Sequence, residues 1–179
     1  MELALNEVKV QAKKLLKAIK RDPILQQHMA PQLKRLEIKD GDDLQLKHCL
    51  TMLSQQIGFA SWHHAQKVLS GNEDLHSTPD MGKVFYTKAC GGLINLWFAQ
   101  YQQAKTVLSE NPSSRWLIPY QKQFIIVDKD YLNLLKVSKG CEGYWQDINH
   151  DLYGGYNSQA WDKLAYIIIR NRTVDGDTP

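Results

Sequence analysis

The stretch from Leu46 to Ser70 constrains the fold of this chain more than any other, because it encodes two helices joined by a tight turn. Gly58 stands where the end of a helix commonly needs a positive φ angle. Ser61 is placed to cap a second helix, which Gly71 ends. Both helices show the three- and four-residue spacing of apolar positions that marks one buried face, namely Leu46, Cys49, Leu50, Leu53 and Ile57, then Trp62, Ala65, Val68 and Leu69. We predict a helical hairpin over residues 46–70.

Two helices joined by a short glycine turn are also the outline of the helix-turn-helix that reads DNA. With Gly58 as the turn glycine, the core positions of the second helix would fall on His64 and Lys67. The apolar residues stand one position later in each case. Trp62 at the start of the second helix also suits an anchor in the core better than a base-reading surface. The pattern therefore favours a structural hairpin.

The first 45 residues add short helices to a small bundle. Apolar spacing predicts a helix from Leu3 to Lys20. Asp22 is a candidate N-cap with Pro23 at the first helical position, and Pro31 is expected to start a further helical turn. Either Asp42 or Asp43 is expected to cap the hairpin.

Basic residues are concentrated in this first part. Residues 1–70 hold eleven Lys and Arg against seven Asp and Glu, a net charge of +4. A surface that could meet phosphates or an acidic protein is formed by Lys9, Lys13, Lys17, Lys20 and Arg21. Lysine is also what solvated helix surfaces normally carry, and arginine is scarce here, so a plain solvated surface is the favoured interpretation.

The hairpin residues carry a resemblance. The apolar helix around Leu50 to Ile57, followed by Gly58-Phe59, Ser61-Trp62 and Ala65, resembles a short antitoxin-like helical module that stands at the N-terminus of glyoxalase-superfamily proteins. There a basic amphipathic helix precedes it, similar to Val8–Ile19 in this chain. The resemblance covers about the first seventy residues and contains no catalytic residue. Residues 80–179 do not match the metal-binding glyoxalase domain, so that activity is not implied.

A linker is predicted over residues 71–82, because this segment is rich in turn-forming residues and has no apolar periodicity. The second part, residues 83–171, holds fifteen of the seventeen aromatic residues. It is expected to contain a helix over 93–110, a hairpin of strands 115–118 and 123–127, and a final helix capped by Asn157 or Ser158. Pro119 places the first strand at an edge of the sheet, or ends it. Residues 172–179 are expected to form a frayed tail. The fold class is thus mainly α, α+β overall.

Segments similar to Leu117-Ile118-Pro119-Tyr120 with Gln123-Phe124 occur in uncharacterised bacterial proteins, and this resemblance implies no activity.

No cofactor or metal site is expected. His63 and His64 are neighbours and point about 100° apart on a helix, and the chain has neither paired CxxC nor HExxH spacing. A nucleophilic site in the 141–156 region stays open as an alternative, with Cys141 exposed in a glycine-flanked loop and His150 oriented by Asp147 or Asp151. An ordinary loop thiol, and a surface pair of His150 with Asp151, are the favoured interpretations.

Three hypotheses follow. The first is a non-enzymatic interaction or regulatory protein whose aromatic part binds a protein or peptide, with Trp116, Tyr120, Gln123 and His150 as candidate binding residues. An exposed aromatic patch near Trp116 and Tyr120 would favour it. The second is an enzyme with a site near Cys141–Tyr156. The third is a nucleic-acid-associated or antitoxin-like regulator that uses the Lys9–Arg21 surface. Charged residues throughout the first twenty positions exclude a signal peptide there, and the odd cysteine number suits a reducing compartment. We expect a cytoplasmic protein with no membrane partner.

Overall fold

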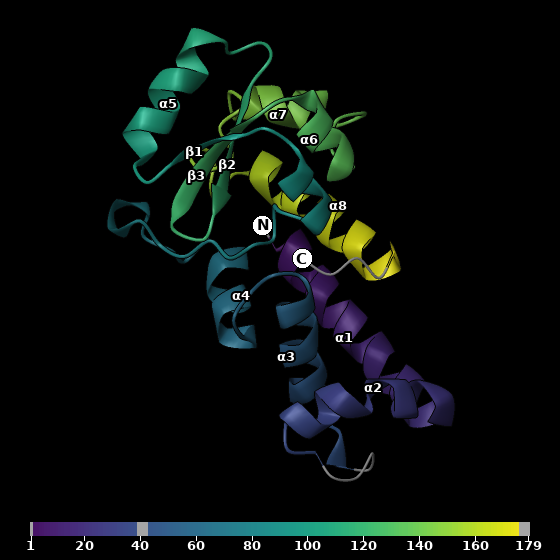
Figure 1. Ribbon diagram of the computed structural model, residues 1–179. Helices are drawn as coiled ribbons and strands as arrows, with labels where there is room; N and C mark the ends of the chain where they lie inside the picture. Colours follow the sequence, from purple (N-terminus) through teal and green to yellow (C-terminus); the bar gives the residue numbers. More distant parts are fainter. Residues whose placement is uncertain (1, 39–42, 176–179) are drawn as a thin grey trace.

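The computed structural model describes residues 2–38 and 43–175, and it confirms a mainly α fold with one small antiparallel sheet (Figure 1). The sheet has the strand order β1-β3-β2, and in Figure 1 it lies between α5 and the helices α6, α7 and α8. The α-helices are α1 Leu3–Arg21, α2 Pro23–Arg35, α3 Leu46–Gln56, α4 Trp62–Leu69, α5 Tyr101–Glu110, α6 Lys129–Leu134, α7 Glu142–Asp147 and α8 Gln159–Asp175. The strands are β1 Leu96–Phe98, β2 Trp116–Tyr120 and β3 Gln123–Val127, and two 3-10 turns cover Leu75–Ser77 and Lys88–Gly92.

The hairpin forms as predicted. Two hydrogen bonds close α3 beyond its last turn: the Phe59 N–H donates to Ser54 O at 2.8 Å and the Gly58 N–H donates to Gln55 O at 3.1 Å. This paired pattern is the Schellman motif, and Gly58 meets its demand for a positive φ with +103°. The Ser61 hydroxyl accepts from the His64 N–H at the start of α4.

Three details of the N-terminal part differ from expectation. Pro31 lies inside α2, because Asp22 nucleates one continuous helix by accepting from the N–H groups of Ile24 and Leu25. Gln45, and not Asp43, is the N-cap of α3, and its N–H donates to His48 Nδ1 at 3.1 Å. Asp42 lies outside the described residues. Trp62, at the first position of α4, is only partly buried, whereas Ala65, Val68 and Leu69 of the same helix are buried.

The expected helix over 93–110 is wrong in its first half. Leu96–Phe98 form β1, which pairs antiparallel with β3, and the helix begins only at Tyr101. The backbone partner of β1 is β3, which is distant in sequence, so the local pattern of Leu96–Phe98 does not reveal it. The predicted β-hairpin of β2 and β3 is confirmed. Strand β2 extends through Pro119 to Tyr120 and lies at an edge of the sheet. The segment around Trp145 forms the short helix α7.

The prediction of a frayed tail over 172–179 is wrong for residues 172–175, which belong to a helix. Helix α8 begins after Ser158, whose hydroxyl accepts from the Trp161 N–H, and it continues to Asp175. Arg172 is buried and donates to Ile57 O at 2.8 Å and to Tyr86 O. These carbonyls hold the last turns of α8 against the body of the protein. Residues 176–179 lie outside the described residues.

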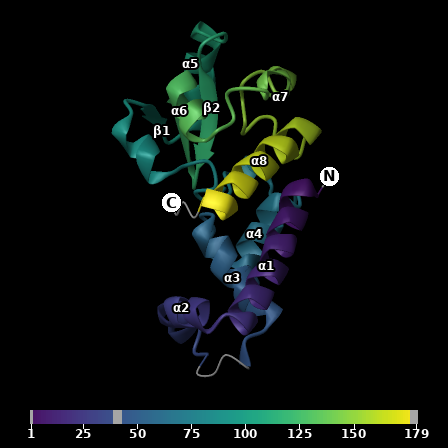
Figure 2. The same ribbon diagram turned by 90° about the vertical axis from the view of Figure 1, so that its right-hand side faces the viewer.

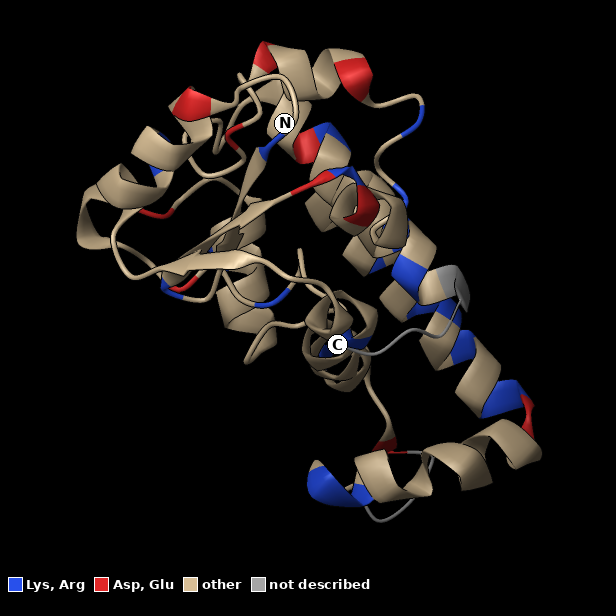
Figure 3. Ribbon diagram, turned by 45° about the horizontal axis from the view of Figure 1, so that its top comes forward, with Lys and Arg blue, Asp and Glu red and all other residues tan. Residues whose placement is uncertain are grey.

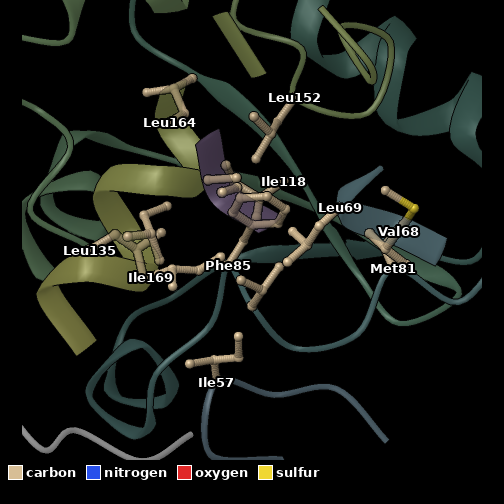
Figure 4. Close-up of a cluster of buried hydrophobic side chains, with 14 of the residues drawn as sticks. Ile57, Val68, Leu69, Met81, Phe85, Ile118, Leu135, Leu152, Leu164 and Ile169 are labelled. Carbon is tan, nitrogen blue, oxygen red and sulfur yellow. The ribbon is translucent and has the colours of Figure 1, made fainter. Parts of the chain in front are cut away.

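One connected hydrophobic core joins residues from before and after the 71–82 segment. Figure 4 shows its centre, where Ile57 and Val68 from the hairpin lie near Phe85, Ile118 and Ile169. The 71–82 segment itself is tied down, since Met81 is buried and the Tyr153 hydroxyl donates to Leu75 O. The division of the chain into two parts stays a prediction.

Helix α8 packs along α1, as Figures 1 and 2 both show. The N-cap residue of α1, Glu2, makes no side-chain capping bond. Instead the buried carboxylate of Asp162 in α8 accepts from the N–H groups of Leu3 and Ala4, both at 3.0 Å. A carboxylate at this place accepts hydrogen bonds from the free amides and is attracted to the positive end of the helix dipole.

We predict that Asp162→Ala lowers the free energy of unfolding by about 3 kcal/mol, because it removes two charge-assisted hydrogen bonds and leaves the Ala4 N–H buried. Asp162→Asn keeps one acceptor oxygen but loses the charge, so we expect about half that loss. Urea denaturation followed by circular dichroism measures both. Equal midpoints for the wild type and Asp162→Ala would contradict the prediction.

A second prediction concerns the turn of the hairpin. A Cβ at Gly58 would lie 2.7 Å from the Lys83 carbonyl carbon, and the Lys83 N–H already donates to Gly58 O. We expect Gly58→Ala to lose about 3 kcal/mol, of which about 1 kcal/mol comes from the positive φ. Gly140→Ala is the matched control, because Gly140 has a φ of +75° and nothing within 4 Å of its Cβ position. Equal losses in the two variants would show that the contact with Lys83 costs nothing.

Candidate functional site at the open edge of the sheet

The two edge strands of the sheet, β1 and β2, differ in whether their outer backbone groups are hydrogen-bonded. The outer side of β2 is covered, because the Leu117 N–H donates to His150 O at 2.9 Å and Leu117 O accepts from the Leu152 N–H at 3.0 Å. The outer side of β1 has no backbone hydrogen-bond partner among the described residues. Strand β1 is therefore an open edge that can accept a further strand.

Exposed apolar side chains gather at this edge. Ile94 is fully exposed, Leu96 is 44% exposed and Trp97 is 46% exposed. The other large exposed apolar residues of the described chain are scattered singly over α1, α2 and α6. Edge strands of monomeric proteins usually carry lysine, proline or a bulge that discourages pairing, whereas β1 has only Leu, Trp and Phe. Such a cluster makes the edge of β1 a candidate interaction surface.

Three aromatic rings form what we call the aromatic cluster, consisting of Tyr86, Trp97 and Tyr120. The Trp97 and Tyr120 rings lie 5.2 Å apart at 85°, and the Tyr86 and Tyr120 rings lie 4.9 Å apart at 64°. These edge-to-face contacts hold each ring in a defined orientation. The Lys83 ammonium lies 5.9 Å from the centre of the Tyr120 ring, which places a cation at its border.

The position of the aromatic cluster is set by the backbone beneath it. The Tyr86 carbonyl accepts from the Arg172 guanidinium of α8. Gly91 passes so close that a Cβ there would lie 2.8 Å from the Tyr86 hydroxyl oxygen. Trp97 is fixed by the pairing of β1 with β3, in which it faces Ile125. The rings therefore stand on rigid elements, as a binding site requires.

The candidate binding residues chosen from the sequence fall into two separate groups. Tyr120 belongs to the aromatic cluster, and Gln123 pairs with it across the turn and is exposed. Trp116 stands at the other end of β2, four residues or about 13 Å away along the strand. It stacks on His150, with ring centres 4.9 Å apart at 29°.

The Trp116–His150 pair lines a cavity of about 280 Å³ together with Lys129, Glu142 and Gln146. Trp116 Nε1 and His150 Nδ1 are both buried and have no hydrogen-bond partner among the described residues. Because these nitrogens have almost no solvent-accessible surface, a ligand in the cavity would not reach them in this arrangement. Asp147, the other candidate here, is exposed and does not line the cavity.

The basic residues of α1 lie on a different part of the molecule. Lys13, Lys17, Lys20 and Arg21 are exposed and Lys9 is partly buried. Figure 3 shows the basic residues distributed along this helix. None of them forms an ion pair with an acidic residue of the described chain.

The alternative of a nucleophilic site near His150 required an exposed Cys141 thiol, and the structure contradicts this. Cys141 is buried, and that burial raises the pKa of its thiol, so the reactive thiolate is disfavoured. The surface pair of His150 with Asp151 is also wrong. Asp151 is buried and accepts from the Tyr101 hydroxyl at 2.6 Å and from the Gly154 N–H at 2.7 Å. Burial and this hydrogen bond raise the pKa of Tyr101.

The described residues contain no group of three or more His, Cys, Asp or Glu side chains that could hold a metal ion. Within the same residues, no helix has the length and apolar character needed to cross a membrane. No family model, curated protein or solved structure matches this chain.

Sequence reasoning missed most of the open edge. The predicted helix over 93–110 places Ile94, Leu96 and Trp97 on a helix and not at the edge of a sheet. The signal that could have found them is the short segment Leu93–Phe98, apolar except for Asn95, between the Gly91-Gly92 pair and the polar Gln100. A run this short, next to glycines, is more typical of a strand than of a helix.

Proposed function

We propose that this protein is a non-enzymatic interaction protein that binds an extended, apolar peptide segment of another protein along β1. The observation that carries this proposal is the coincidence of an unpaired strand edge with Ile94, Leu96 and Trp97 exposed beside it. In this mode of recognition, backbone hydrogen bonds supply affinity, and pockets or platforms for alternate side chains supply specificity.

The two faces of β1 would contact different side chains of the bound peptide. Side chains alternate along a strand, so Trp97 points to one face of the sheet while Leu96 and Phe98 point to the other. A strand laid against the outer side of β1 would set one apolar side chain beside Trp97 and the next beside Leu96. Because β1 has three residues, a few backbone bonds alone give little affinity, and the aromatic cluster must supply most of it.

The test uses peptides selected from a random twelve-residue display library on the immobilised protein. We expect the selected peptides to bind Trp97→Ala at least about 30-fold more weakly, as for a central tryptophan of an interface. Val10→Ala is the matched control, because Val10 is similarly exposed, at 44%, and lies on α1, which packs against α2, α3, α4 and α8. Replacing alternate peptide residues with N-methyl residues should abolish binding in one register only. Peptides that bind wild type and Trp97→Ala equally would contradict the proposal.

A second candidate function rests on the basic stripe of α1. Lys9, Lys13, Lys17 and Lys20 recur along one side of the helix over about 17 Å, and none is paired with an acid of the described chain. A nucleic-acid-associated or antitoxin-like regulator would use such a stripe on phosphates.

For this candidate we expect Lys13→Glu/Lys17→Glu to abolish binding to a 20-base-pair duplex, and we expect wild-type binding to weaken steeply between 50 and 200 mM salt. Fluorescence anisotropy measures both effects. Lys34→Glu/Lys47→Glu, which changes two exposed lysines outside α1, is the control. No binding of the wild type at 50 mM salt would remove this candidate and leave the peptide-binding proposal untouched.

A further inference from the structure

A groove of about 730 Å³ lies between α1, α2 and α3, and it shares no residue with the open edge of the sheet. Gln11, Leu15 and Ala18 line it from α1 at spacings of four and three, so the lining follows one face of that helix for about 10 Å. The remaining lining residues come mainly from α2 and α3. They are Lys14, His28, Met29, Gln32, Arg35, Leu36, Met52, Leu53, Gln55, Gln56 and Thr173.

The groove can adapt to an occupant because α2, which forms one of its walls, buries little of its surface against the rest of the protein. Leu33 is the single buried side chain of α2. Pro31 has no N–H to donate to Gln27 O, which weakens the middle of this helix. Met29 and Met52 face the groove from α2 and α3, and methionine side chains rearrange easily around different apolar partners. The size and apolar character suit the hydrophobic side of a short amphipathic helix.

The charged side chains that line the groove in the described part of the chain are basic. They are Lys14 on α1 and Arg35 on α2, and both are exposed. No Asp or Glu is among the lining residues. Neither Lys14 nor Arg35 forms an ion pair within the described chain. One acid, Glu7, touches the lining, and it does so by accepting from Gln11 Nε2 at 2.6 Å.

We propose that this groove binds an acidic amphipathic helix of a partner protein. Apolar side chains spaced three and four residues apart would enter between Leu15, Met29 and Met52, and flanking Glu or Asp residues would face Lys14 and Arg35. Nucleic acid explains the cations but leaves the apolar lining without a role. A neutral apolar helix explains the lining but leaves the cations without partners. The acidic amphipathic helix uses both, which is why the observations favour it.

The experiment uses a fluorescein-labelled sixteen-residue helical peptide with a leucine stripe and glutamates on both sides of it. Fluorescence anisotropy with the full chain measures its dissociation constant. We expect Lys14→Glu/Arg35→Glu to weaken binding about tenfold, because each change replaces an attraction at the groove border with a repulsion. We expect Met29→Ser to weaken it by a similar factor through lost apolar contact.

The matched control is Lys34→Glu/Lys47→Glu. It makes the same change in net charge at two exposed positions that do not line the groove. We expect its dissociation constant to stay within about threefold of the wild type. A scrambled peptide of the same composition should bind at least about tenfold more weakly than the amphipathic one.

Four outcomes would overturn the proposal. They are no binding of the amphipathic peptide, equal binding of the scrambled peptide, equal losses in the two double-glutamate variants, and a 20-base-pair duplex that competes as well as the peptide. The remaining candidate occupant of the groove is the C-terminal end of this chain itself, and a variant that ends at Asp175 tests it. Peptide binding that appears only in this shortened chain would assign the groove to the chain's own end and would also overturn the proposal. Because the Trp97→Ala variant leaves the groove intact, failure here is distinguishable from failure of peptide binding at β1.

Discussion

The contact that the rest of the structure depends on is the capping of α1 by the Asp162 carboxylate of α8. It joins the first helical turn of the chain to its last helix, across 159 and 158 residues of sequence. An aspartate this buried is stable as a charge only when hydrogen-bond donors surround it, and the free amides of a helix N-terminus are such donors. The pair therefore fixes both the position of α1 along α8 and the burial of the apolar faces between them, which hold Leu5, Val8 and Leu164.

Arg172 extends the same logic to the other end of α8. Its guanidinium donates to the carbonyl oxygens of Ile57 and Tyr86, at the end of α3 and beneath the aromatic cluster. Carbonyls at helix ends and in loops lack partners of their own, and a buried arginine that binds them would leave them unsatisfied if it were lost. Helix α8 thus supports the hairpin at one point and the candidate binding edge at another. A binding surface that stands on such supports loses little conformational entropy when a ligand arrives.

The parts of this fold that the sequence predicts are those that local chemistry decides. Gly58, Ser61, Asp22 and Ser158 act within a few residues of themselves, so their caps and turns follow from spacing alone. The strand β1 depends on β3, almost thirty residues later, and no periodicity over three residues can reveal that partner. Arg172 was expected in a frayed tail for a similar reason. What holds it is the backbone carbonyls of Ile57, Lys83 and Tyr86, which lie 115, 89 and 86 residues away and which any sequence could supply.

The candidate site shows the same division. Tyr120 could be chosen from the sequence because it follows a recognisable strand, but its value as a binding residue comes from Trp97 and Tyr86, which only the folded sheet brings to it. The groove between α1, α2 and α3 was also hidden, since Lys14 and Arg35 belong to helices whose angle is a tertiary property. In the finished structure, Thr173 lines that groove while its neighbour Arg172 binds the carbonyl of Tyr86. The last turns of α8 therefore touch both proposed surfaces. Any coupling between them would require these turns to take two arrangements, and the burial of Arg172 holds them in one. The two surfaces are best understood as independent sites on a common support.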